Sequence, residues 1–250
     1  MNEWLNDLRT AVAFLTRLPM PHPDGAKPAN FVRAHRMFPV VGAAIGGAVG
    51  LLYLAMRAMG LPDLGAAALA LGASAILTGA LHEDGLADVA DGFGGGRDPA
   101  AKLEIMLDSR LGTYGALILM VSFVTKLSAL KTLGDAMVVQ SLIAAHALAR
   151  GVLPVMAMSL DYARKDGLAV NAGRPDFATA AIAAALALVI ALLALPLVEA
   201  LYAAAVATVC TTSMAWLAQR QIGGQTGDVL GSAEQLAETA ILVLLATRLA

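Results

Sequence analysis

Residues 37–59 read MFPVVGAAIGGAVGLLYLAMRAM, and Arg57 is the only charged side chain in this stretch. A helix needs about 20 apolar residues to cross the hydrocarbon core of a bilayer, so the segment predicts a transmembrane helix. Gly42, Gly46 and Gly50 recur every four residues, and small residues on one stripe let transmembrane helices approach closely. The segment therefore predicts a membrane protein built as a compact helical bundle.

The composition of the whole chain points to the same class. Hydrophobic residues make up 58% of the 250 residues and charged residues 14%, whereas soluble domains are about 25% charged. The net charge is only −2, and no basic patch with interleaved aromatic residues occurs, so no nucleic-acid partner is expected. Cys210 is the only cysteine, which excludes disulfides within the chain and cysteine-based metal sites.

Apolar segments recur along the chain after the first one. We therefore expect an all-α, polytopic bundle of about seven transmembrane helices, forming a single membrane-embedded domain over residues 1–250. Residues 2–17 are amphipathic, charged and too short to span, which predicts an N-terminal helix in the membrane interface. The predicted spans are residues 37–59, 64–81, 112–131, 136–158, 177–195, 197–217 and 233–249.

The basic residues predict the orientation of these spans. Twelve of the 17 lysines and arginines fall on the side that holds the N-terminus, and three fall on the other side. Because basic residues concentrate on the cytoplasmic side, we expect a multi-pass protein of the cytoplasmic (inner) membrane with its N-terminus inside. The twelve are Arg9, Arg17, Lys27, Arg33, Arg36, Arg97, Lys102, Arg110, Arg164, Lys165, Arg174 and Arg220.

A polar segment on that same side, HEDGLADVADGFGGG at residues 82–96, carries the best candidate chemistry. Asp84, Asp88 and Asp91 stand at i, i+4 and i+7, so a helix would place all three on one face. Such crowded carboxylates repel unless a cation lies between them, and oxygen-only ligands suit Mg²⁺ or Mn²⁺. Over seven residues a helix rises about 10 Å, so Asp88 can share a metal with either neighbour. The alternative is a solvated helix end with acidic residues near its N-terminus.

Two neighbours of these aspartates have several candidate roles. His82 is a candidate metal ligand or proton shuttle, or an ordinary polar residue at the membrane boundary. Glu83 points about 100° away from Asp84 on a helix, so it is a candidate metal ligand, a supporting residue or a surface residue.

A second polar cluster, Asp108-Ser109-Arg110, precedes the third predicted span on the same side. Arg110 is a candidate phosphate-binding residue because a guanidinium grips phosphate with two hydrogen bonds. Asp108 could orient it or ligate a metal, and Ser109 could contact substrate. The alternative is a helix cap next to an arginine that reaches toward the lipid headgroups.

A third cluster lies in GGQTGDVLGSAEQLAE, residues 223–238. Thr226 and Asp228 are candidates to contact a second substrate or a metal, and the alternative is a glycine-rich turn capped by Asp228. Arg150 falls inside the fourth predicted span, where a charge is costly and indicates either function, such as substrate binding, or a side chain that reaches back to the interface.

The motifs FLTRLP (14–19), FPVVGAAIGG (38–47), HEDGLADVADGFGGG, IMLDSRLGTYG (105–115) and GGQTGDVLG (223–231) together resemble the cobalamin synthase family of membrane adenosylcobinamide-GDP ribazoletransferases. The resemblance extends over nearly the whole chain, and the acidic motif is its most specific part.

The resemblance implies that adenosylcobinamide-GDP reacts with α-ribazole or its 5′-phosphate, giving adenosylcobalamin or its 5′-phosphate and GMP, with Mg²⁺ as cofactor. In this scheme Asp84, Asp88 and Asp91 hold the metal, Arg110 grips the phosphates, and Asp91, in preference to His82, accepts the proton of the ribazole 3′-hydroxyl. A homo-oligomer or an association with other enzymes of the corrinoid pathway stays open.

Other classes also use acidic residues on membrane helices. The signature of CDP-alcohol phosphatidyltransferases begins Asp-Gly-x-x-Ala-Arg, whereas Asp84-Gly85 is followed here by Leu86-Ala87-Asp88. Membrane prenyltransferases usually carry two similar acidic motifs, and the second cluster here holds one acid. A transporter should place its carboxylates near the middle of the bilayer rather than at its edge.

Overall fold

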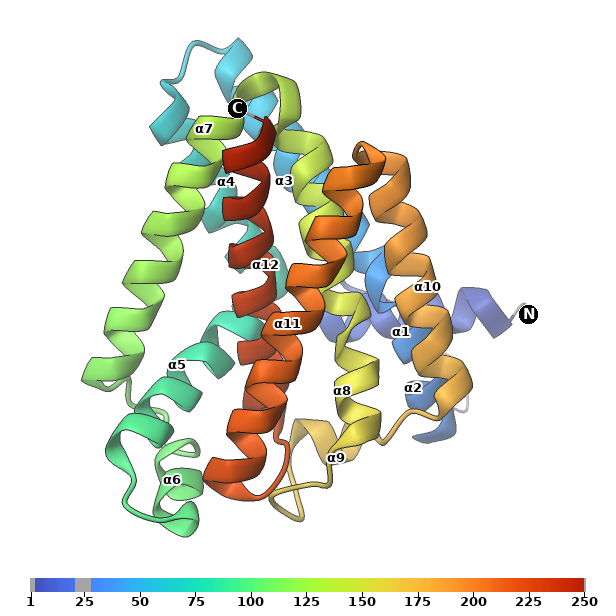
Figure 1. Ribbon diagram of the computed structural model, residues 1–250, viewed down its shortest axis with the longest axis vertical. Coiled ribbons are helices and arrows are strands. Elements are labelled where there is room, and N and C mark those ends of the chain that lie inside the picture. The colour runs from blue at the N-terminus through green and yellow to red at the C-terminus, as the bar shows by residue number, and fades with distance from the viewer. Residues whose placement is uncertain (1–2, 21–27, 250) are drawn as a thin grey trace.

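The computed structural model describes residues 3–20 and 28–249, so Asn2 of the predicted interfacial helix and Lys27 lie outside the described residues. The all-α prediction is confirmed, because the described chain forms helices and its only β-type pairing is a single bridge between Tyr162 and Gln225 (Figure 1). The helices are α1 Glu3–Leu15, α2 Pro28–Ala34, the short 3₁₀ helix η1 His35–Met37, α3 Phe38–Ala58, α4 Asp63–Thr78, α5 Leu81–Gly95, α6 Pro99–Ile105, α7 Thr113–Gly151, α8 Leu153–Ser159, α9 Leu168–Ala172, α10 Phe177–Ala194, α11 Leu197–Ile222 and α12 Gly227–Leu249.

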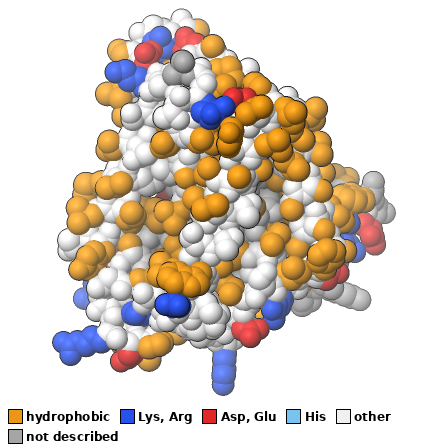
Figure 2. Space-filling model, in the orientation of Figure 1, with side chains coloured by type: hydrophobic (Ala, Val, Ile, Leu, Met, Phe, Trp, Pro, Cys, Tyr) orange, Lys and Arg blue, Asp and Glu red, His pale blue; other side chains and the backbone are white. Residues whose placement is uncertain are grey.

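The surface is that of a membrane protein. Large apolar side chains stand exposed on the outer helices, among them Leu193 (84%) and Ile76 (79%), where lipid rather than water would cover them. On the face seen in Figure 2, hydrophobic side chains cover the middle and most charged side chains lie toward the two ends. Five helices of the described chain are long and apolar enough to cross a membrane, or six if the bent pair α4–α5 counts as one crossing.

That count treats residues 113–159 as one helix, but the chain turns back within it at Gly134. Lys126 and His146 both contact Glu238, at 2.6 and 3.1 Å, although a straight helix would separate them by about 30 Å. Gly134 makes the turn with φ 60° and ψ −171°, which is backbone that essentially only glycine adopts. The two halves of α7 therefore lie side by side, and they correspond to the spans predicted at residues 112–131 and 136–158 (Figure 1).

The span predicted at residues 64–81 differs from the structure. Helix α4 ends at Thr78 after 16 residues, and α5 leaves it at an angle of 91°. Gly79 and Ala80 both adopt left-handed backbone, with φ of 67° and 54°, and this ends the helix before it is long enough to span. The bend turns the acidic segment sideways, so that α5 runs obliquely from α12 toward the first half of α7 and α6 rather than continuing along α4 (Figure 1).

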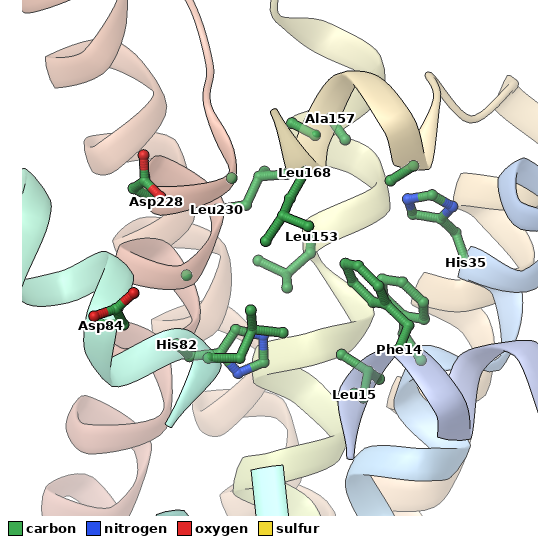
Figure 3. A pocket seen from close by; sticks show the side chains of 16 residues that line it. Phe14, Leu15, His35, His82, Asp84, Leu153, Ala157, Leu168, Asp228 and Leu230 are labelled. Carbon is green, nitrogen blue, oxygen red and sulfur yellow. The ribbon is translucent and has the colours of Figure 1, made fainter. Parts of the chain in front are cut away.

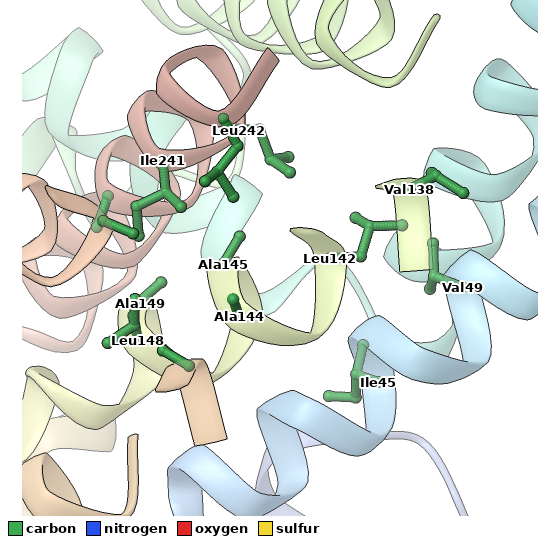
Figure 4. Close-up of a cluster of buried hydrophobic side chains, with 14 of the residues drawn as sticks. Ile45, Val49, Val138, Leu142, Ala144, Ala145, Leu148, Ala149, Ile241 and Leu242 are labelled. Carbon is green, nitrogen blue, oxygen red and sulfur yellow. The ribbon is translucent and has the colours of Figure 1, made fainter. Parts of the chain in front are cut away.

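The second half of α7 forms the centre of the core, between α3 and α12 (Figure 4). Gly42 and Gly46 of α3 face it so closely that a Cβ atom at either position would collide with the carbonyl oxygens of His146 and Leu142. The glycine stripe predicted to permit close packing is therefore a helix contact.

Helix α1 lies across the bundle, roughly perpendicular to the long helices (Figure 1). Its Asp7 is fully buried and forms ion pairs with Arg33 at 3.0 Å and Arg36 at 2.7 Å. These pairs fix α1 to α2 and η1. The polar segments of the sequence are gathered at one end.

Candidate active site

The acidic segment is a helix, as predicted, and it packs against the start of α12. Gly85 makes this contact possible, because a Cβ there would lie 2.8 Å from the carbonyl oxygen of Asp228. The close approach brings Asp228 beside Asp84 and Asp88 of α5, from which it is 144 and 140 residues away in the sequence. Asp84 and Asp228 line the same cavity (Figure 3). The structure therefore joins the first and third polar clusters of the sequence.

The carboxylates in this region repel one another. Burial has the largest effect on the pKa of Asp88, followed by the negative charges of Asp84, Asp228 and Asp91, and together they raise it to about 7 although Arg164 lowers it. The negative charge in this region is therefore only partly balanced by a protein cation. Carboxylate oxygens with excess negative charge are the donor set that Mg²⁺ prefers, so these residues fit that ion.

The described residues do not form a closed metal cage at this place. Within that part of the chain, only His146, Glu234 and Glu238 bring three ligand atoms within 4.8 Å of one another. Mg²⁺ commonly binds through one or two carboxylates together with substrate phosphates, and the looser spacing on α5 suits that mode of binding.

Asp91 has a different set of contacts from Asp84 and Asp88. The backbone N–H of Gly112 donates to its Oδ2 at 2.8 Å, and the N–H of Gly115 donates to its Oδ1 at 2.9 Å. These are two of the N–H groups that the first turn of a helix leaves without a partner, so Asp91 caps α7 from the neighbouring helix. Glycine is needed at both positions, because a Cβ would collide with the carboxylate. This explains the glycines of the sequence LGTYG.

In the third cluster, Thr226 and Asp228 have different roles. Thr226 caps α12, since its hydroxyl oxygen accepts a hydrogen bond from the N–H of Val229 at 3.2 Å. The same hydroxyl donates to Oδ2 of Asp228 at 3.1 Å. Arg164 donates to that oxygen at 3.0 Å from the loop between α8 and α9. Asp228 is therefore held in place by two residues and faces α5.

The second cluster lies on an exposed loop. Asp108 accepts hydrogen bonds from the backbone and side chain of Arg110, which lower the pKa of Asp108 to about 2. The Arg110 side chain is 87% exposed, and Ser109 is also exposed. The loop leads directly into Gly112, which binds Asp91, so this cluster adjoins the acidic helix through the chain.

Arg150 and His82 belong to a buried ionic network at the interface of α5, α7 and α12. Arg150 is 1% exposed, contacts Glu234 at 2.5 Å and does not line the cavity beside Asp84 and Asp228. His82 lies 3.3 Å from Glu234 on one side and lines the cavity beside Asp84 on the other. The network is completed by Lys126, His146, Gln235 and Glu238.

Lys126 and Arg150 neutralise the two glutamates of this network, which therefore has no need of a metal ion although three of its ligand atoms converge. Sequence reasoning missed the network. Glu234 and Glu238 stand at i, i+4, as do His146 and Arg150, and two such facing pairs within apolar segments are the signal that could have revealed it.

Glu83 faces away from Asp84. It lines a separate cavity of about 510 Å³ between α4, α5, the first half of α7 and α12, together with Lys126 and Glu238. Its Oε2 is buried without a hydrogen-bond partner. The structure thus separates Glu83 from the metal ligands with which the sequence groups it.

The cavity beside Asp84 and Asp228 is small, about 70 Å³, and has two kinds of wall (Figure 3). The aspartates and His82 lie at one end, and Phe14 and His35 lie at the opposite end. Leu153, Leu168 and Leu230 line the space between them. The FLTRLP motif contributes Phe14 and Leu15 to this wall, so a distant motif of the sequence adjoins the acidic helix.

Comparisons with known proteins agree with this arrangement. The family model described as cobalamin-5-phosphate synthase matches residues 7–246, which include every site residue discussed above. A relative from Bradyrhizobium diazoefficiens named adenosylcobinamide-GDP ribazoletransferase is 44% identical, over 96% of this chain and 93% of the relative. Relatives of the same name from Azorhizobium caulinodans and Mesorhizobium japonicum are 42% and 41% identical over 96% of this chain, and cover 94% and 92% of those relatives. No solved structure matches the chain.

Proposed function

The chain belongs to the cobalamin-5-phosphate synthase family, and we propose that it joins adenosylcobinamide-GDP to α-ribazole or α-ribazole 5′-phosphate. This is the step that assembles the nucleotide loop of cobalamin. Family membership decides between this transferase and the CDP-alcohol phosphatidyltransferase and transporter alternatives. The observation that carries the site assignment is the convergence of Asp84, Asp88 and Asp228 from two polar motifs of the sequence at one end of a membrane bundle.

The reaction is an in-line phosphoryl transfer. The ribazole 3′-hydroxyl oxygen forms a bond to the β-phosphorus, the phosphoanhydride bond to the α-phosphate breaks, and GMP leaves with the bonding electron pair. The hydroxyl proton passes to a base on the protein. Such reactions depend on positioning and on charge neutralisation more than on covalent chemistry by the protein.

Asp84 and Asp88 would hold Mg²⁺, with Asp228 as a third carboxylate beside them. When bound, Mg²⁺ neutralises charge on the diphosphate and on the departing GMP. Asp91 and Glu83 contribute less directly in this proposal, because Asp91 caps α7 and Glu83 faces a different cavity.

His82 is the better-placed candidate to accept the hydroxyl proton, while burial and the charge of Arg150 lower its pKa well below the usual value. It lines the cavity that Asp84 and Asp228 line, and it precedes Asp84 by two residues in the sequence. Both oxygens of Asp91, the other candidate, already accept backbone hydrogen bonds, so a proton taken up there would displace a cap of α7.

We place the protein in the cytoplasmic membrane with α5, the N-terminus and the site facing the cytoplasm. The support is the concentration of basic residues in the segments that form this end of the bundle. Soluble, highly charged substrates such as a GDP derivative would then reach the site without crossing the bilayer.

The variant Asp88→Asn tests the site assignment. GMP release from adenosylcobinamide-GDP should fall at least about 100-fold, because the substitution removes a charged metal ligand at the centre of the cluster. The protein is purified in detergent with ribazole as second substrate, and turnover is measured across a Mg²⁺ titration and after chelation with EDTA.

The matched control is Asp166→Asn, the same substitution at an exposed aspartate of the loop between α8 and α9. It should keep wild-type turnover. Near-normal activity of Asp88→Asn, or undiminished wild-type activity in EDTA, would contradict the metal assignment. A wild-type protein that releases no GMP would contradict the proposed reaction itself.

A further inference from the structure

Arg164 is the basic residue closest to the acidic cluster, and only part of its guanidinium is used. Nη2 donates to Oδ2 of Asp228 at 3.0 Å. Nε and Nη1 are buried and have no hydrogen-bond partner, and the side chain is 15% exposed. Buried donors are nearly always paired in folded proteins, so two unpaired donors on one guanidinium indicate a partner that binds there.

The loop that carries Arg164 is firmly held. The N–H of Gln225 donates to the carbonyl oxygen of Asp161 at 2.8 Å, and the N–H of Ala163 donates to the carbonyl oxygen of Gln225 at 2.9 Å. The side-chain amide of Gln225 also donates to the carbonyl oxygens of Ala157 and Leu160, at 2.7 and 2.8 Å. The position of Arg164 is therefore set before any ligand arrives.

The backbone next to Arg164 is shaped around its side chain. Gly167 has φ 105°, and a Cβ at this position would lie 3.2 Å from Nε of Arg164. The loop thus wraps closely around the guanidinium without offering it a second acceptor. An ion pair with Asp228 alone would need only the one donor that is already engaged.

The other arginines near the site are engaged elsewhere. Arg110 is 87% exposed and bound to Asp108 of its own loop, whereas Arg150 lies within the buried ionic network. Arg164 alone of these three combines burial, unpaired donors and direct contact with a carboxylate of the cluster. The N–H groups of Nε and Nη1 lie on different edges of the guanidinium, so each can donate one charge-assisted hydrogen bond to an oxygen of a diphosphate.

We propose that Arg164 binds the diphosphate of the GDP-activated substrate through Nε and Nη1, while Nη2 keeps Asp228 in place. This assignment rests on the proposed function, because it takes the nucleoside diphosphate as the ligand. It gives the phosphate-binding role that the sequence suggests for Arg110 to a residue on a different loop.

The test compares Arg164→Gln, Arg164→Lys and the control Lys165→Gln, which removes the neighbouring exposed cation. Binding of GDP and of adenosylcobinamide-GDP to the full-length protein in detergent is measured without ribazole, so that no turnover occurs. Arg164→Gln should weaken both ligands by about 10- to 100-fold, since a charged pair of hydrogen bonds is lost. Arg164→Lys should restore part of the affinity, and Lys165→Gln should bind like wild type.

A second measurement separates phosphate binding from a purely structural role. If Arg164 served only to hold Asp228, its variants would raise the Mg²⁺ concentration needed for half-maximal activity and leave GDP affinity unchanged, and that result would overturn the proposal. Equal loss of affinity in Lys165→Gln would also overturn it, because it would indicate a general charge effect. Arg164-dependent binding of GDP by a wild-type protein that makes no cobalamin product would support this proposal while refuting the proposed reaction.

Discussion

Asp91 shows how one carboxylate in a cluster of three can take a structural role. Its two oxygens each accept a backbone N–H from the first turn of α7, at 2.8 and 2.9 Å. The dipole of α7 also favours a negative charge at this end of the helix. Replacing Asp91 should therefore reduce the stability of α7 more than the rate of the reaction. Its spacing from Asp84 and Asp88 in the sequence suggests instead that the three share one function.

The variant Asp91→Asn tests this division of roles. Its side-chain nitrogen cannot accept a hydrogen bond, so one cap is lost at a cost of about 1–2 kcal/mol. We expect a lower midpoint of thermal unfolding in detergent, a pH profile of kcat/KM like that of wild type, and residual turnover well above that of Asp88→Asn. Complete loss of turnover in a protein of unchanged stability would show instead that Asp91 is the base.

At the scale of the helices, the contact between α3 and α7 depends on small residues. Gly46→Ala should destabilise the bundle by about 2 kcal/mol or more, because the added methyl collides with backbone rather than with a flexible side chain. Gly47→Ala is the matched control, since its Cβ would lie 3.6 Å from Ile143, an ordinary contact. Thermal unfolding of the two purified variants measures the difference, and equal midpoints would mean that the helices can separate at no cost.

The glycine stripe and the acidic helix could be predicted because each follows from the spacing of residues within one segment. The role of Arg164 could not be predicted, because its contact with Asp228 joins residues that are 64 apart in the sequence. The loop that carries Arg164 also takes a path that depends on Gln225. Glu234 and Glu238 weaken the apolar pattern of the last span when the sequence is read alone. Their partners Lys126, His146 and Arg150 come from another helix, and no single segment reveals that pairing.

The break between α4 and α5 is another feature that could not be predicted from the sequence. Residues 64–81 satisfy a hydropathy criterion for a span, but the left-handed backbone of Gly79 and Ala80 ends α4 after 16 residues. An alanine with positive φ cannot be predicted from local propensity, since tertiary packing imposes it. The turn is also what directs the carboxylates of α5 toward α12, so the feature hardest to predict is the one that builds the site.

For the molecule as a whole, the buried ionic network links the site to the interior of the bundle. His82 contacts Glu234, and Lys126 and Arg150 balance the two glutamates, so the network carries no excess charge. Removing one partner of such a group typically costs about 3–5 kcal/mol, because a buried charge is left alone. The network therefore fixes α5 and α7 against α12 and keeps the acidic helix at one end of the bundle.

The orientation of that end in the membrane can be tested with single cysteines. In a Cys210→Ala background, Glu104→Cys lies on α6 near the acidic helix, and Lys131→Cys lies near the turn of α7 at the opposite end. A membrane-impermeant maleimide should label Lys131→Cys in intact cells and Glu104→Cys only after the cytoplasmic membrane is permeabilised. This follows because basic residues crowd the end that holds α6.

The reverse labelling pattern would place the carboxylates outside the cell. The charged GDP-activated substrate would then need a route across the bilayer, and the proposed access from the cytoplasm would be wrong. Labelling of both positions in intact cells would instead indicate leaky membranes, which a cysteine in a cytoplasmic reporter protein detects in the same sample. With that reporter unlabelled, the labelling pattern assigns the face of the membrane on which Asp84, Asp88, Asp228 and Arg164 meet their substrate.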